Sequence, residues 1–218
     1  MDAGALLAVV AHPDDESFGL GAVLDAVVRA GGQVTVLCFT HGEASTLHGA
    51  AGDLGRLRPA ELAAAAEILG VQRTVLLDFP DGQLSGVDLA ALTRHVLAVA
   101  REIGADTLLA FDSNGVTGHP DHVRATEAAV GAAAELDLPV WGWTVPSSVA
   151  TTLNDELGAA FAGRAPDEID EVLTADRPRQ WKAIAAHASQ SNDNPVLRRR
   201  LELLGDREHL RLLSRAGR

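Results

Sequence analysis

Cysteine, basic side chains and long apolar runs are all scarce in this chain of 218 residues. The single cysteine, Cys38, excludes an intramolecular disulfide and a thiolate metal cluster, and is compatible with a reducing compartment. Lys and Arg number 18 against 30 Asp and Glu, a formal net charge of −12 that would repel nucleic-acid phosphates and anionic membranes. No stretch of about 18 uncharged apolar residues is present, so no membrane insertion is expected. These absences favour a cytoplasmic protein whose partner is not a nucleic acid.

The apolar run at residues 3–10 does not have the form of a secretion signal. Asp2 precedes it where a signal carries a basic residue, and acidic residues at 14–16 follow it where a signal has a small-residue cleavage site. We therefore interpret this run as part of the fold.

Short apolar runs alternate with longer segments of helical period along most of the chain. This alternation predicts right-handed crossovers, and hence an α/β fold with a Rossmann-like, doubly wound, mostly parallel sheet and helices on both faces. We expect a single domain over residues 1–218, with a core at about 1–145 and a C-terminal extension at about 146–218. The expected strands are 6–10, 33–39, 74–77, 107–111, 138–144 and 168–173, and the expected helices are 20–29, 59–69, 89–103, 122–134, 178–188 and 195–204.

Two His-Pro-Asp motifs follow expected strands. Residues 12–16, His-Pro-Asp-Asp-Glu, come after the first strand, and residues 118–122, Gly-His-Pro-Asp-His, come after the fourth. Both motifs should open onto the same edge of the sheet, where doubly wound sheets bind ligands. One acidic loop alone is usually a solvated turn or a helix cap. Two such clusters in one crevice would be repulsive without a cation, so together they predict a divalent metal site.

The spacing of the motifs indicates which residues bind the metal. His12 and Asp15 are three residues apart on one turn, and His122 completes a three-ligand set that leaves a position open for water, as in catalytic zinc sites. Fe²⁺ or Co²⁺ would also suit nitrogen and oxygen ligands. Asp14 is left beside the metal as the candidate general base. His119 is a candidate for polarising a carbonyl, holding an oxyanion or protonating a leaving group.

Other polar residues near the motifs have less defined roles. We expect Asp121 to orient a histidine ring, with His119 the favoured partner. His187 is expected to be a buried structural histidine, with bracing of the site as the alternative. His41 and His48, in the long loop at 41–55, are candidate substrate contacts.

Taken together, the two motifs resemble those of the LmbE/PIG-L family of zinc-dependent N-deacetylases. Residues 40–43, Thr-His-Gly-Glu, and 58–62, Arg-Pro-Ala-Glu-Leu, also match family segments, and residues 186–190, Ala-His-Ala-Ser-Gln, resemble a C-terminal family signature. Members of the family act on N-acetylglucosamine conjugates. The resemblance therefore implies a zinc-dependent enzyme that removes the N-acetyl group from a small-molecule amino-sugar conjugate.

The resemblance also implies a role for each motif residue. It implies that His12, Asp15 and His122 bind zinc. It makes Asp14 the general base and gives His119 the oxyanion-stabilising or acid role.

Three further residues occupy positions at which relatives contact the substrate. Arg58 and Asp81 correspond to residues that contact sugar hydroxyls. The alternatives are an ion pair of Arg58 with Glu61 at a helix start, and an ordinary Asp-Gly turn at Asp81. Thr117 stands where some relatives carry a mobile tyrosine that helps to hold the oxyanion, and this chain has no tyrosine.

Other functions fit the sequence less well. A dinucleotide-binding protein would need Gly-x-Gly-x-x-Gly after the first strand, where this chain has two aspartates and a glutamate. A non-haem iron oxygenase shares the ligand types but usually has a β-rich barrel. Hydrolysis of another amide or an ester in natural-product biosynthesis, and a metal-binding homologue without activity, stay as alternatives. A homo-oligomer is compatible with the sequence.

Overall fold

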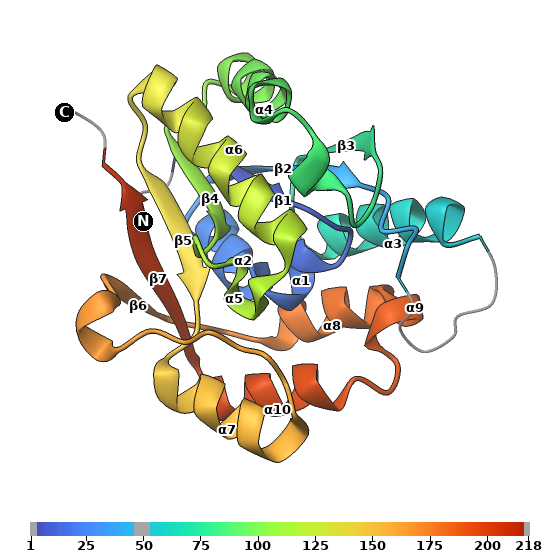
Figure 1. The fold of residues 1–218 in the computed structure, drawn as a ribbon, viewed down its shortest axis with the longest axis vertical. Coiled ribbons are helices and arrows are strands. Elements are labelled where there is room, and N and C mark those ends of the chain that lie inside the picture. Colours follow the sequence, from blue (N-terminus) through green and yellow to red (C-terminus); the bar gives the residue numbers. More distant parts are fainter. Residues whose placement is uncertain (1–3, 46–52, 216–218) are drawn as a thin grey trace.

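The computed structural model describes residues 4–45 and 53–215, which build one seven-stranded sheet in the order β3-β2-β1-β4-β5-β7-β6 (Figure 1). Neighbouring strands from β3 to β5 are parallel, and β7 is antiparallel to both of its neighbours. The expected doubly wound, mostly parallel sheet is confirmed. The strands are β1 Ala5–Val10, β2 Gln33–Thr40, β3 Arg73–Phe79, β4 Thr107–Phe111, β5 Val140–Thr144, β6 Glu171–Thr174 and β7 Arg207–Ser214.

Helices cover both faces of this sheet. The α-helices are α1 Asp15–Phe18, α2 Gly21–Arg29, α3 Leu54–Leu69, α4 Leu89–Ile103, α5 Gly115–Gly118, α6 Pro120–Leu136, α7 Ser147–Leu157, α8 Pro178–Ala186, α9 Ala188–Ser191 and α10 Pro195–Leu204, and the short 3-10 helices are η2 Leu84–Gly86 and η3 Pro166–Glu168. Among the described residues, no helix combines the length and the apolar character that crossing a bilayer requires.

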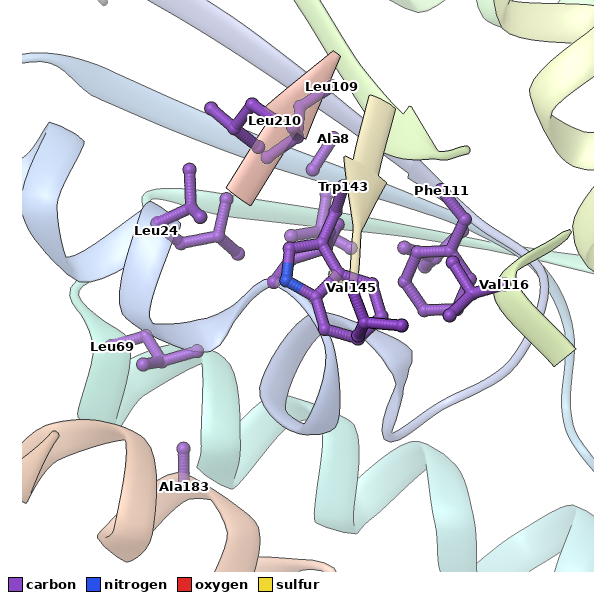
Figure 2. Close-up of a cluster of buried hydrophobic side chains, with 14 of the residues drawn as sticks. Ala8, Leu24, Leu69, Leu109, Phe111, Val116, Trp143, Val145, Ala183 and Leu210 are labelled. Atoms are coloured by element: carbon purple, nitrogen blue, oxygen red, sulfur yellow. The ribbon is translucent and has the colours of Figure 1, made fainter. Parts of the chain in front are cut away.

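The central strand β1 shows how the sequence builds two cores. Alternate side chains of a strand point to opposite faces, so Leu6 and Ala8 pack with α2, α3 and α8, while Leu7 and Val9 pack with α4 and α6. Figure 2 shows part of the first core around Trp143. The sheet is therefore buried on both faces, and its strand ends are where polar groups can gather.

The order of the strands places the two motifs side by side. The chain winds outward from β1 through β2 to β3, then returns to lay β4 along the other side of β1, with Leu6 opposite Thr107. The carboxyl ends of β1 and β4 therefore flank the point where the winding direction reverses. Ligands bind at this point in open α/β sheets.

Helix α3 begins earlier than the expected start at Pro59. Proline has no backbone N–H, so in a helix the carbonyl four residues before it loses its partner. Here that carbonyl belongs to Gly55, and His41 Nδ1 lies 3.0 Å from its oxygen. The hydrogen bond from the preceding loop explains why the helix continues through Pro59.

The two longest elements of the C-terminal part that the sequence pattern does not predict are α7 and β7. In β7 the adjacent residues Glu208 and His209 are both buried, so the strand lacks the polar and apolar alternation of a half-buried strand. Glu208 is satisfied by Trp143, whose Nε1 donates to its carboxylate at 2.7 Å. The buried Glu208 carboxylate is satisfied by a partner distant in the sequence, and a local pattern cannot reveal it.

Candidate metal centre and active site

The first motif forms a tight turn between β1 and α1. Asp15 closes this turn because its Oδ2 accepts hydrogen bonds from the backbone amides of Ala11, at 3.1 Å, and His12, at 2.9 Å. Asp14 has φ 111° and ψ −28°, a conformation that residues with a Cβ rarely adopt. The turn thus holds the Asp15 carboxylate through backbone amides, and it presents the preceding carboxylate, Asp14, from a strained backbone conformation.

Polar atoms of three residues from the two motifs meet at this turn. His12 Nδ1 lies 3.2 Å from His122 Nε2, which lies 3.2 Å from Asp15 Oδ1. His12 Nδ1 lies 3.7 Å from Asp15 Oδ2. A tetrahedral zinc ion with bonds of about 2.0–2.2 Å requires ligand atoms about 3.3–3.6 Å apart. The spacing fits, so this His/Asp group could hold a metal ion.

The second ring nitrogen of His12 faces two carboxylates. Its Nε2 lies 3.0 Å from Asp81 Oδ1 and 3.5 Å from Asp121 Oδ2. Burial lowers the pKa of His12, but the two carboxylates outweigh it and raise this pKa to about 10. A carboxylate behind a metal-binding histidine fixes the ring and increases its basicity. Asp81 and Asp121 are placed to do this for His12.

The predicted pairing of the Asp121 carboxylate with His119 is wrong. His119 caps α6, and its Nδ1 accepts a hydrogen bond from the Asp121 backbone amide at 3.2 Å. The Asp121 side chain instead accepts from the amides of Gly82, at 2.8 Å, and Leu84, at 3.0 Å. Because the helix start binds His119 through the backbone, the carboxylate is available to the neighbouring loop and to His12.

Asp14 is held by Arg58. The Arg58 Nη2 lies 3.0 Å from Asp14 Oδ2, and the same buried guanidinium donates to the carbonyls of Gly42, at 2.6 Å, and Pro13. Burial raises the pKa of Asp14 to about 6, against the opposing effect of Arg58. A raised pKa strengthens this carboxylate as a proton acceptor.

The alternative ion pair of Arg58 with Glu61 is not formed. The Glu61 carboxylate accepts hydrogen bonds from the backbone amide and hydroxyl of Ser189, at 2.9 and 2.6 Å. Arg58 and Glu61 are one turn apart on α3 but contact different parts of the protein. Arg58 contacts the first motif, and Glu61 contacts the C-terminal part of the chain.

A cavity of about 400 Å³ opens beside these groups. Its volume lies in the range of small-molecule sites. Thr117 is exposed and is not part of the lining, so the structure does not bring it to the other predicted site residues. The described residues that line the cavity are His12, Asp14, Asp15, Ala44, Ser45, Arg58, Asp81, Gly82, His119, His122 and Gln190.

Sequence reasoning did not name two of the polar side chains in the lining, Ser45 and Gln190. Ser45 Oγ donates to Gln190 Oε1 at 2.7 Å, which links the loop after β2 to α9. Gln190 ends the C-terminal segment that resembles a family signature, and Ser45 lies in the loop at 41–55 that contains the candidate contacts His41 and His48; neither residue had a signal of its own. His41 binds Gly55 O and Asp78 rather than the cavity, and His48 lies outside the described residues.

The fold and the site together define a doubly wound α/β protein with a His/Asp metal-binding group at the reversal of its sheet. The family model described as PIG-L, GlcNAc-PI de-N-acetylase, matches residues 7–134. A curated relative from Nakamurella multipartita, a 1D-myo-inositol 2-acetamido-2-deoxy-alpha-D-glucopyranoside deacetylase, is 33% identical over 236 residues, with 85% of this chain and 79% of the relative covered. The chain belongs to the PIG-L family.

Solved structures share the fold. The antimicrobial reagent A40926 pseudoaglycone deacetylase Dbv21 matches with a TM-score of 0.72 and 22% identity, over 98% of both chains. GalB from Pseudomonas putida, a 4-carboxy-2-hydroxymuconate hydratase, matches with a TM-score of 0.75 and 18% identity, over 100% of this chain and 98% of GalB. These two proteins catalyse different reactions, so the fold alone does not decide the chemistry.

Proposed function

We propose that this protein is a zinc-dependent hydrolase that removes the N-acetyl group from an N-acetylglucosamine-type conjugate. The observation that carries the proposal is the convergence of three ligand residues and the partly buried Asp14 carboxylate in one small-molecule cavity. The curated relative that is a deacetylase of an acetamido-glucopyranoside supports the substrate class.

A zinc ion held by His12, Asp15 and His122 would supply Lewis acidity that polarises the acetyl carbonyl and acidifies the attacking water. Asp14 takes the proton from that water as it attacks the carbonyl carbon. Arg58 keeps the Asp14 carboxylate oriented, since the guanidinium is itself fixed by two backbone carbonyls. The proton on Asp14 then passes to the departing nitrogen, and acetate and the free amine leave.

His119 stabilises the developing oxyanion. Its Nδ1 accepts a hydrogen bond from the backbone amide of Asp121. In the neutral ring the proton is therefore on Nε2, and this nitrogen can donate to substrate. Burial and the neighbouring histidines lower the pKa of His119, which favours the neutral ring. This geometry supports the oxyanion role over the acid role.

Arg58 and Asp81 line the cavity as well as orienting other groups, and we propose both as contacts for sugar hydroxyls. Asp81 also accepts from the Ala44 amide at 2.9 Å and lies against His12, so its Asp-Gly turn serves the site. Thr117 stays a prediction, because its hydroxyl would reach substrate only beyond the cavity lining.

The test is a joint measurement of metal content and acetate release. The protein is purified without added metal, analysed by elemental mass spectrometry, and assayed with N-acetylglucosamine and several of its glycosides, including the inositol glycoside. Stoichiometric zinc with acetate release is the expected result. Failure to bind metal after reconstitution would overturn the proposal, and full metal without release from any of these compounds would contradict the substrate class.

A further inference from the structure

Glu16, the last residue of the first motif, is fully buried and is not part of the cavity lining. Its Oε2 accepts a hydrogen bond from the backbone amide of Asp14 at 2.9 Å. Its Oε1 lies 2.6 Å from His187 Nε2 and also accepts from the hydroxyl of Ser17. One carboxylate thus joins the backbone of the proposed base to a histidine 171 positions along the chain.

The backbone that Glu16 holds is the strained one. At φ 111° Asp14 is far from the conformations that residues with a Cβ prefer, and such conformations persist only when surrounding contacts determine them. The direction of the Asp14 carboxylate follows from this dihedral angle. Relaxation toward negative φ would turn the carboxylate away from the ligand atoms. The hydrogen bond from the Asp14 amide to Glu16 opposes this relaxation, and we call this support of the Asp14 backbone the brace.

His187 contacts this brace through one nitrogen only. It lies at the junction of α8 and α9 with no exposed surface, and its Nδ1 has no hydrogen-bond partner among the described residues. Burial lowers the pKa of His187, but the Glu16 carboxylate outweighs it and raises this pKa. The bond from Nε2 to Glu16 is therefore charge-assisted and strong.

The same part of the chain also holds the far end of α1. Gln180 Nε2 donates to Ser17 O at 3.1 Å, and Arg200 Nη2 donates to Phe18 O. The last carbonyls of a helix need partners from outside it, and α1 has only four residues. Figure 1 shows α1 next to α8, and the two helices are in contact. His187, Gln180 and Arg200 all lie beyond residues 7–134, the part that the family model matches.

We propose that His187 is a positioning residue for the reaction: through Glu16 it holds the strained backbone of Asp14, so the C-terminal third of the chain supplies part of the active-site geometry. This inference rests on the proposed function in one respect, the role of Asp14 as the base. Its structural content, a brace from His187 to the Asp14 amide, can be measured without activity.

Two substitutions of similar size separate the two nitrogens of the imidazole. In His187→Gln the side-chain amide nitrogen comes near the place of Nε2, which contacts Glu16. In His187→Asn it comes near the place of Nδ1, which has no partner. Misplacing a catalytic group by about 1 Å costs on the order of 100-fold in rate. We expect His187→Asn to lower kcat by about 10- to 100-fold with KM and zinc content unchanged, and His187→Gln to stay within about fivefold of the parent.

Only His187→Gln keeps a donor near the place of Nε2, so equal kcat values for His187→Gln and His187→Asn would overturn the proposal. Arg199→Gln is the matched control, because Arg199 lies in the same C-terminal part but pairs with Glu156 on the surface. We expect the control to keep the parent kcat.

Hydrogen exchange at the Asp14 amide gives the second readout and needs no substrate. This amide should exchange slowly in the parent and in His187→Gln, and at least tenfold faster in His187→Asn; equal rates would also overturn the proposal. If the parent binds zinc but releases no acetate, the proposed function fails while the exchange experiment still decides the brace. If His187→Asn does not fold, the parent alone carries the test: the hydrogen bond of the Asp14 amide to Glu16 predicts protection, and exchange as fast as in an unstructured peptide would overturn the brace.

Discussion

Replacing Asp14 by asparagine tests the central step of the proposed mechanism. The substitution removes the proton acceptor and keeps the size of the side chain. The three ligand atoms belong to other residues, and the asparagine oxygen can still accept from Arg58, so metal binding and the turn should survive. General base catalysis typically contributes 10²–10⁴-fold, so kcat should fall by about that factor, which corresponds to about 2.7–5.4 kcal/mol of barrier.

The loss of charge beside Arg58 has a separate effect on stability. The guanidinium keeps its bonds to two carbonyls, so we expect the free energy of unfolding to fall by about 1–3 kcal/mol rather than by the full cost of a broken buried pair. Thermal unfolding in the presence of zinc measures this, and assays well below the melting temperature keep it apart from the effect on kcat.

The assay measures acetate release at saturating and limiting substrate, with zinc determined by elemental mass spectrometry on the same samples. Asp155→Asn, a charge-matched change at an exposed residue of α7, is the control and should behave as the parent. A kcat near that of the parent in zinc-loaded Asp14→Asn would refute the base role. Loss of zinc from this variant would refute the ligand set, because it would make Asp14 a ligand.

The remaining predictions concern the metal and acid stability. His12→Ala should bind less than a tenth of the parent's zinc, because it removes one of three ligands; full zinc content by elemental mass spectrometry would contradict the assignment. Removal of zinc by a chelator should abolish acetate release and, where free zinc had been about 100 times the dissociation constant, remove about 2.7 kcal/mol of stability, or about 5–10 °C in Tm; calorimetry that shows no shift would contradict a zinc site in the folded state. Burial raises the pKa of Asp112, but its hydrogen bonds and the guanidinium groups of Arg164 and Arg211 outweigh this and lower it. A carboxylate with a lowered folded pKa stabilises fully above its unfolded pKa of about 3.9, and this is lost as pH falls through the folded value. In urea unfolding of the metal-free protein, the free energy of unfolding of the parent should therefore exceed that of Asp112→Asn at pH 6, and this difference should narrow below about pH 4. A difference that does not change with pH would contradict the ion pairs.

The sequence predicts the parallel part of the sheet well because its strands are buried on both faces. A strand such as 107–111 is a continuous apolar run with a polar loop after it, and these features are local. The position of the candidate site follows from the same pattern, since it requires only that two motifs follow two parallel strands. The C-terminal part could not be predicted in this way, because β7 buries Glu208, whose partners are Trp143 on β5 and Arg177 just before α8.

The same distinction applies within the site. That His12, Asp15 and His122 meet is a consequence of topology, which the order of strands and loops already indicates. That Asp121 faces His12 rather than His119 depends on the backbone hydrogen bond at the start of α6 and on the amides of Gly82 and Leu84 that hold the carboxylate, and no spacing rule contains these contacts. The link from Asp14 through Glu16 to His187 depends on how α8 packs against α1. Contacts between residues distant in the sequence, such as those of Asp121 and Glu16, determine the direction of the site side chains. Only the three-dimensional packing of the chain reveals these contacts.

The likeness to both a deacetylase and a hydratase shows where the reaction must be sought. A bound metal ion that acidifies water suits addition to an alkene as well as attack on an amide. Amide hydrolysis has two further needs, a donor aimed at the carbonyl oxygen as it gains charge and a base that can return its proton to nitrogen. The Nε2–H of His119 and the carboxylate of Asp14 line the same cavity from opposite motifs, which meets both needs. The evidence for a hydrolase therefore lies in these two side chains and their supports, more than in the ligand set.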